Sequence, residues 1–447
     1  MRLKIKFITA LSSIIMLATP AFSQYSSSSY FMTDNWQSSM LNPAITPEHG
    51  YILIPTLGHF GVNIGSSNLT LENLFYPNPN GAGIVPFYDI DIDKSSLINS
   101  LDTNNHICGD ISMAILGAGF YTNNIFWNIG VNTKATCDSS IPKGAFELAA
   151  LSREDSSYSL KDLSISSTSY IETYVGASLQ INKKLSVGAR IKFLMGFYNI
   201  DVNYDHFDIL LKNSEWKISS SGMFNATAMG LSLKEDIDGF DFDGLEFEPK
   251  IQVVGYGAGV DFGVNYNLLE ELSLSLAVTD LGFISWEGDQ TISAEASSNY
   301  TFSGYNTSDE NSLSDFDIDE LLRFKSVEAE DRKTSLNTQI NAAVEYRFLD
   351  DKMAAGLLYS SIFRCNYTKN EITSLVSFRP LEYLTANVSY AFIGKQIGAA
   401  LNIHTNWINF FVGADYIPTS LTPQYLPIKA ANFSFYSGIG IPLTKRK

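Results

Sequence analysis

Apolar and polar residues alternate one by one over residues 163 to 181, which read LSISSTSYIETYVGASLQI. Most odd positions are apolar, as at Ile171 and Val175, whereas even positions such as Ser164 and Glu172 are polar. A period of two is typical of a β-strand with one apolar and one polar face. Strands of soluble domains usually end after about 5–6 residues. The length of this one therefore indicates a strand of a membrane-spanning barrel.

The same alternation recurs at 185–197, 251–268 and 335–348. One face of each segment is polar or consists of glycines, and buried polar side chains need water or polar partners, so this face should line the lumen. The residues assigned to the lumen are Arg190, Lys192, Gly255, Gly257, Gly259, Glu345 and Arg347. The alternate glycines fit inward strand positions better than a dinucleotide turn. They leave a smooth wall for a plug segment or a ligand.

Short and long connections alternate along the chain. Short turns are predicted at 123–124, 182–184, 269–271, 349–352, 379–382 and 404–406, and longer loops at about 138–162, 231–250, 287–333 and 417–431. Outer-membrane barrels place short turns in the periplasm and long loops outside. The prediction is an all-β fold, a transmembrane antiparallel β-barrel of about 14 to 16 strands. Residues 432–443 should close it, because an open sheet edge leaves unpaired backbone groups in lipid.

The N-terminus has the features of a secretory signal peptide. Arg2, Lys4 and Lys6 precede an apolar run, and a small-residue cleavage site follows at 21–23. Loss of residues 1–23 changes the formal charge from −17 to −20, which disfavours nucleic acid as a partner. No later stretch of 18 apolar residues predicts a transmembrane helix. The expected location is the outer membrane, with its lipid as a partner; a secreted β-sandwich or adhesin is the alternative.

Signatures of catalysis are absent from the sequence. The five histidines show no metal-ligand spacing, and there is no nucleophile elbow or phosphate-binding loop. Acidic clusters at 89–93, 236–243 and 309–320 do not match a calcium-binding EF-hand loop and are expected to be solvated. We therefore expect neither an enzyme, nor a metal site, nor a cofactor.

Two of the three cysteines lie near each other in the predicted hairpin around the turn at 123–124. If that turn has two residues, positions whose numbers sum to about 247 are opposite, so Cys137 lies close to Cys108. A disulfide between them is feasible in an oxidising compartment, and free thiols are the alternative. Cys365 is left without a partner in either case.

After the signal peptide the chain reads YFMTDNWQSSMLNPAITPEHGYILIP. This segment resembles the start of a family of Bacteroidota outer-membrane proteins known only as a domain of unknown function. Its motif Asn42, Pro43 and Ala44 is similar to the N-terminal segment of the long-chain fatty acid transporter (FadL-type) superfamily, which includes the PorV-like accessory proteins of type IX secretion. The resemblance implies a barrel of about 14 strands with that segment folded into the lumen as a hatch.

The residues themselves agree with a hatch. Pro43 and Pro47 disfavour a regular strand. The expected division is therefore a signal peptide at 1–23, a hatch at 24–50 and a barrel at 51–447. We expect a barrel that passes or binds a hydrophobic small molecule through a hatch-gated lumen. The alternative is an accessory or scaffold protein for secretion or surface assembly, whose outer loops hold a protein partner. An apolar pocket beside the hatch would favour the first function, and a filled lumen the second.

Overall fold

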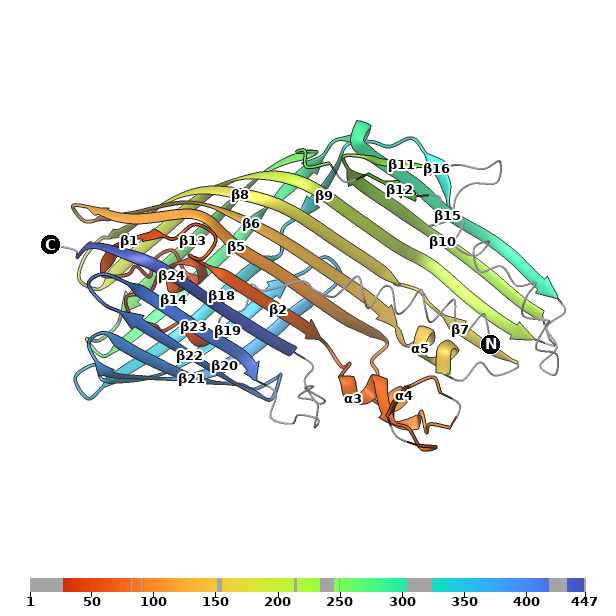
Figure 1. Cartoon of the computed structure of the whole chain (residues 1–447), viewed down its shortest axis with the longest axis horizontal. Helices are drawn as coiled ribbons and strands as arrows, with labels where there is room; N and C mark the ends of the chain where they lie inside the picture. Colours follow the sequence, from red (N-terminus) through yellow and green to blue (C-terminus); the bar gives the residue numbers. More distant parts are fainter. Residues whose placement is uncertain are drawn as a thin grey trace.

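The computed structural model describes residues 27–81, 83–89, 91–150, 155–212, 215–233, 245–248, 250–303, 324–417 and 432–445. Within these ranges, 14 wall strands form one closed antiparallel barrel (Figure 1). The first wall strand is in two pieces, β1 (His49–Leu53) and β2 (Phe60–Ser66), and the last is β24 (Asn432–Lys445). Both pieces pair with β24 on one side and β5 on the other, so the wall has no open edge. The predicted fold class is confirmed, at the lower strand number.

The remaining wall strands follow one another around the barrel in chain order. They are β5 (Asn104–Thr122), β6 (Ile125–Pro142), β8 (Ser164–Gln180), β9 (Leu185–Lys212), β13 (Gly255–Asn267), β14 (Leu272–Trp286), β18 (Thr338–Phe348), β19 (Met353–Phe363), β20 (Thr368–Leu381), β21 (Leu384–Ala391), β22 (Gln396–His404) and β23 (Asn409–Ile417).

The break in the first wall strand contains Pro55, which has no N–H to donate to a ladder. Thr56 there has a positive φ of 63°. The backbone of this break still bonds both neighbours, since Thr56 N donates to Ala114 O and Ile439 N donates to Leu57 O. The wall therefore stays continuous across the interruption.

The short turns that follow β5, β8, β13, β18, β20 and β22 lie at one end of the barrel, together with the start of β1 and the end of β24; we call it the turn end. The other end, the loop end, carries the long connections. On that side β9 leaves β13 near Gly196 and pairs instead with β10 (Glu215–Ala228), which pairs with β15 (Thr291–Ser303). Figure 1 shows these strands extending beyond the barrel. The predicted loop at 287–333 is therefore wrong in part, because it contains β15.

Smaller elements complete the loop end. They are α3 (Leu71–Leu74), β3 (Phe75–Pro77), β4 (Ile84–Pro86), α4 (Ser95–Ser100), α5 (Lys143–Ala150), β7 (Ser156–Ser159), β11 (Leu231–Leu233), β12 (Leu245–Phe247), η3 (Gly288–Gln290), β16 (Lys325–Val327) and β17 (Arg332–Ser335). An apolar core joins α4 and α5 to the inner face of β9, β10 and β15; Leu97, Phe146, Ile209 and Trp216 lie in it. We call this one-sided assembly the loop-end unit.

Large apolar side chains stand on the outward face of the wall strands. Ile191 is 65% exposed, and Phe262, Leu276 and Val388 are about half exposed. The next residue on the same strand, Lys192, is buried. An outward apolar face with an inward polar face is the pattern of a transmembrane barrel. Among the described residues, no helix has both the length and the apolar character to cross a membrane.

Candidate functional site

The N-terminal segment lies inside the barrel, mainly in the turn-end half (Figure 1). It contains a short 3₁₀ turn, η1 (Ser27–Ser29), and one helix, α2 (Trp36–Leu41). Asn35 caps α2, because its side chain accepts a hydrogen bond from Gln37 N at 2.7 Å. We use the name hatch segment for residues 27–48; residues 24–26 of the predicted hatch lie outside the described ranges.

Polar side chains of the wall hold the backbone of the hatch segment. A backbone carbonyl that is buried without a partner is costly, and an irregular segment has few internal partners. Within the described part, eight hatch carbonyl oxygens accept hydrogen bonds from side chains of eight wall strands. The donors are Tyr121 to Pro47 O, Ser178 to Pro43 O, Arg190 to Ser39 O, Asn341 to Leu41 O, Arg379 to Phe31 O, Asn387 to Ser28 O, Asn402 to Thr33 O and Asn409 to Asp34 O.

Aromatic and aliphatic side chains of the hatch segment pack on an apolar part of the inner wall. Trp36 is 1% exposed and lies with its ring centroid 5.2 Å from that of Phe411 and 5.5 Å from that of Tyr51. Phe126 and Tyr436 belong to the same cluster. A second cluster joins Tyr30, Phe31 and Leu41 to Leu358 and Leu375 of β19 and β20. The hatch therefore covers an apolar surface in an otherwise polar lumen.

The motif Asn42, Pro43 and Ala44 ends α2 and contacts the wall directly. Asn42 is fully buried; its Oδ1 accepts from Ala44 N at 2.9 Å and its Nδ2 donates to Tyr30 Oη at 3.2 Å. The wall opposite consists of glycines: a Cβ at Gly188 would collide with Pro43 O, and one at Gly263 with Asn42 Oδ1. Two bare wall positions therefore allow the hatch backbone to approach β9 and β13.

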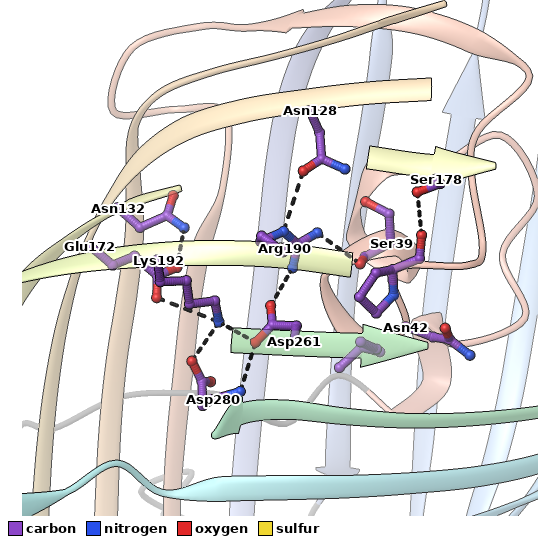
Figure 2. Close-up of polar contacts among 12 residues, drawn as sticks. Ser39, Asn42, Asn128, Asn132, Glu172, Ser178, Arg190, Lys192, Asp261 and Asp280 are labelled. Carbon is purple, nitrogen blue, oxygen red and sulfur yellow. Dashed lines mark hydrogen bonds and ion pairs between the residues drawn. The ribbon is translucent and has the colours of Figure 1, made fainter. Parts of the chain in front are cut away.

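A cluster of charged side chains lies beside the hatch, and Figure 2 shows Glu172, Arg190, Lys192, Asp261 and Asp280 of this cluster. It contains three cations and three anions on five neighbouring strands: Lys134 on β6, Glu172 on β8, Arg190 and Lys192 on β9, Asp261 on β13 and Asp280 on β14. We call it the lumen charge cluster. All six side chains are less than one-tenth exposed.

Short contacts join all six groups. Asp261 binds Arg190 and Lys192, each at 2.8 Å. Asp280 binds Lys192 at 2.6 Å and Lys134 at 3.1 Å, and Glu172 binds Lys134 at 3.0 Å. Asp280 has a positive φ of 57° at a β-bulge, and its N–H donates to Asp261 Oδ1 at 2.8 Å. The bulge thus turns Asp280 toward the cluster and couples β14 to β13.

Arg190 links the cluster to the hatch. Besides Asp261, it donates to Asn128 Oδ1 at 3.3 Å and to Ser39 O at 3.0 Å, and it stacks over the Tyr174 ring at 5.0 Å. Planar guanidinium groups suit such simultaneous contacts. Since the cluster has no net charge, the hatch docks against a neutral polar surface.

A cavity of about 60 Å³ lies between α2 and part of the charge cluster, beside the direct bond from Arg190 to Ser39 O. Gln37, Met40 and Leu41 line it on the hatch side, and Glu172 and Asp280 on the wall side. A space of this size holds a few water molecules. Among the described residues, no group of three or more His, Cys, Asp or Glu side chains is placed to hold a metal ion.

The other residues assigned to the lumen lie away from the hatch motif. Gly255 packs against Trp286, and Gly259 faces Leu336 and Lys192 with ordinary spacing, while Gly257 lies against the β14 backbone. The glycine that meets the hatch is Gly263. Leu336, which the alternation assigned to the lipid face, is instead 7% exposed inside the barrel, because β17 and β18 are separate strands.

Glu345 and Arg347 lie near the turn end. Glu345 accepts from Arg379 at 2.9 Å, and the same arginine donates to Phe31 O of the hatch. Arg347 is more exposed and bonds the neighbouring turn at Glu270 O and Asp351. Of these two residues, Glu345 lies beside the hatch and Arg347 does not.

The predicted disulfide between Cys108 and Cys137 is wrong, since both thiols are free and buried. The hairpin starts in the expected register, but a β-bulge between Ala114 and Leu116 shifts it by one residue. Cys137 then lies opposite Gly109, and Cys108 opposite Asp138. Opposite residues share a face, so the two thiols point to different sides of the sheet.

Sequence reasoning did not single out Lys134, Asp280 or Arg379. Lys134 lies at an even position of the predicted strand 125–137, as do the inward residues Phe126, Asn128 and Asn132. The alternation of that strand therefore predicts that Lys134 also faces the lumen. Asp280 has no such signal, because its bulge interrupts the alternation.

Comparison with protein families gives one match. Residues 43–415 match the model of DUF5723, described as a family of unknown function. The chain belongs to this family. A search of curated proteins finds no match.

Solved structures of similar topology are distant. The P. putida toluene transporter TodX is 8% identical, with 92% of this chain and 95% of that chain covered and a TM-score of 0.39. A Pseudomonas aeruginosa FadL homologue is 10% identical, with 95% and 99% covered and a TM-score of 0.41. The translocator domain of autotransporter NalP from Neisseria meningitidis is 8% identical, with 88% of each chain covered and a TM-score of 0.34. At these values the likeness carries no functional argument.

Proposed function

We propose that this protein is an outer-membrane barrel whose hatch segment closes a binding site for a hydrophobic small molecule, which the barrel binds or passes when the hatch moves. The turn end would face the periplasm and the loop end the outside, as in barrels with short periplasmic turns. The lipid of the outer membrane would surround the apolar outward face.

The observation that carries this proposal is the way in which the hatch is attached. Side chains of eight wall strands bind its backbone, whereas a wall strand would be held by a continuous backbone ladder. Side-chain bonds can be exchanged for water one at a time, each with a small net change in free energy of about 1 kcal/mol. The hatch can therefore leave without breaking the barrel.

The chemistry of the ligand follows from what the hatch covers. If Trp36 leaves, Tyr51, Phe411 and Tyr436 lose their apolar partner. Exposed apolar surface costs about 25 cal/mol per Å² in water, so an apolar molecule of similar size should replace the hatch side chains. A docked hatch competes with such a ligand, because Trp36 occupies the apolar surface that the ligand would cover.

The double variant Gly188→Ala and Gly263→Ala tests the proposal in the full-length protein. The added Cβ atoms collide with the hatch motif and should displace it. In lipid nanodiscs, a naphthylamine fluorescent probe should then bind more tightly than to the wild type, as measured by energy transfer from tryptophan. Gly259→Ala is the matched control, since its Cβ would have no atom closer than 3.4 Å. Adding Phe411→Asn should abolish the gain.

A second candidate is the accessory or scaffold function, favoured by the loop-end unit. A closed pore needs only the barrel, yet this chain builds a one-sided sheet with its own apolar core beyond the wall. Equal probe binding by the wild type and the double variant would contradict the hatch proposal. The scaffold function would then account better for the filled lumen.

A further inference from the structure

The tip of the β19–β20 hairpin, residues 364–367, lies across the lumen from its own strands. In wall order β19 is the ninth strand, whereas β5 is the second and β6 the third. Arg364 nevertheless bonds both: its Nη1 donates to Asp110 Oδ2 at 3.0 Å, its Nη2 also reaches Asp110, and its Nε reaches Asp138. In a closed barrel of 14 strands, such contacts join opposite sides.

The contacts of the tip are buried and specific. The Arg364 side chain is fully buried, and those of Asp110 and Asp138 are 1% and 3% exposed. Asn63 donates to Asp110 at 3.1 Å, so the acceptor is itself held in place. Arg364 and Asp110 form a bidentate pair, in which two N–H groups of one arginine donate to the two oxygens of one carboxylate, and such a pair has a defined geometry.

Neighbouring residues of the tip also contact the far wall. Asn366 Nδ2 donates to Ser164 Oγ on β8 at 2.8 Å. Tyr367 stacks on His106 of β5, with ring centroids 4.2 Å apart. The tip is therefore attached to three strands on the opposite side of the lumen.

We propose that residues 364–367 are a latch that closes the lumen on the loop-end side, independently of the hatch, so that passage requires the release of both. This inference rests on the proposed function. The hatch motif contacts β9 and β13 near the turn end, whereas the latch contacts the loop-end halves of β5, β6 and β8. The two closures share none of the hydrogen bonds named above and therefore act in series.

Ion conductance of the full-length protein in planar bilayers tests the latch. Arg364→Gln leaves two buried carboxylates without a cation, and the loss of a buried ion pair should raise the released population about 100-fold. We expect low conductance from the wild type, from Gly188→Ala with Gly263→Ala, and from Arg364→Gln alone. The combination of all three substitutions should conduct. The matched control is the same combination with Arg347→Gln in place of Arg364→Gln. Among the described residues, Arg347 bonds Glu270 O and Asp351, which both lie at the turn end.

A reversible cross-link provides the second measurement. In the conducting combination, Asn366→Cys and Ser164→Cys are introduced after Cys108, Cys137 and Cys365 are changed to Ser. A bis-methanethiosulfonate linker should restore low conductance, and dithiothreitol should reopen the barrel. Asp110→Asn with Asp138→Asn, which removes the two negative charges instead of the positive one, should have the same effect as Arg364→Gln.

The outcomes separate the latch from the hatch. If the hatch variant alone conducts as well as the combination, the latch is overturned, while the hatch proposal is still judged by probe binding. If every variant floats with lipid vesicles and stays closed, residues 364–367 do not close the lumen. A chain that fails to insert into vesicles overturns the proposed function and the latch together.

Discussion

At the residue scale, the interior of this barrel depends on charges that neutralise one another. Removing a charge from water costs several kcal/mol, and only a nearby opposite charge with good geometry compensates this cost. Asp261 has two cations within 2.8 Å and also accepts the N–H of Asp280. Substitution of Asp261 should therefore lower the stability of the barrel more than substitution of an exposed charged residue.

Asp261→Ala should lower the free energy of unfolding by about 3–5 kcal/mol, because Arg190 and Lys192 lose a buried partner. Urea unfolding in detergent micelles, followed by tryptophan fluorescence, measures the change. Glu215→Ala is the control: its contact with Lys217 is exposed and should change stability by less than about 1 kcal/mol. Equal effects of the two substitutions would show that the cluster is not a stabilising network.

At the element scale, β9 passes through two environments. Its first half carries Ile191 and Phe193 on the outward face, which is apolar. Beyond Gly196 the strand belongs to the loop-end unit, where Asn203 is outward and exposed and the side chain of Asp208 is 44% exposed. In the proposed outer-membrane location, this strand of 28 residues would cross the membrane and continue into water.

Arginine substitutions along β9 test this division. Ile191→Arg places a charge on the lipid face and should cost about 2–4 kcal/mol of folding free energy. Asn203→Arg, on the same strand but beyond the membrane, should cost little. Folding into vesicles at increasing urea concentration, read from the heat-modifiable band on gels, compares the two. A similar loss at both positions would place the membrane boundary elsewhere.

At the scale of the whole molecule, the asymmetry of the two ends implies one orientation. Within the described ranges, the turn end contains tight connections alone, and the loop end carries the loop-end unit and the latch. Lys217 lies on the outer side of that unit with its side chain 56% exposed, whereas Asp351 lies at the turn end with 67% exposed.

Labelling of intact cells tests location and orientation together. In a Cys365→Ser background, Lys217→Cys should react with a membrane-impermeant maleimide, because the proposed orientation places the loop end outside. Asp351→Cys should react only after the outer membrane is permeabilised. The protein should also fractionate with the outer membrane. The reverse labelling pattern would invert the proposed topology, and recovery in the soluble fraction would contradict the location.

The sequence by itself determined the features that depend on neighbouring residues. Alternation over 163–181 and 185–197 shows which residues share a strand face, because successive side chains of a strand point to opposite sides. Short turns and the prolines of the hatch are also local signals. For these reasons the barrel, and the buried sites of Arg190 and Lys192, agree with expectations from the residues alone.

Only the tertiary structure decided what depends on distant pairing. The bulge between Ala114 and Leu116 moved Cys137 away from Cys108, although the turn itself was predictable. The pairing of β10 with β15 and the bond from Arg364 to Asp110, which spans 254 positions, join segments whose local patterns contain no information about each other. Such contacts follow from closure of the barrel, since closure alone determines which inward side chains face one another across the lumen.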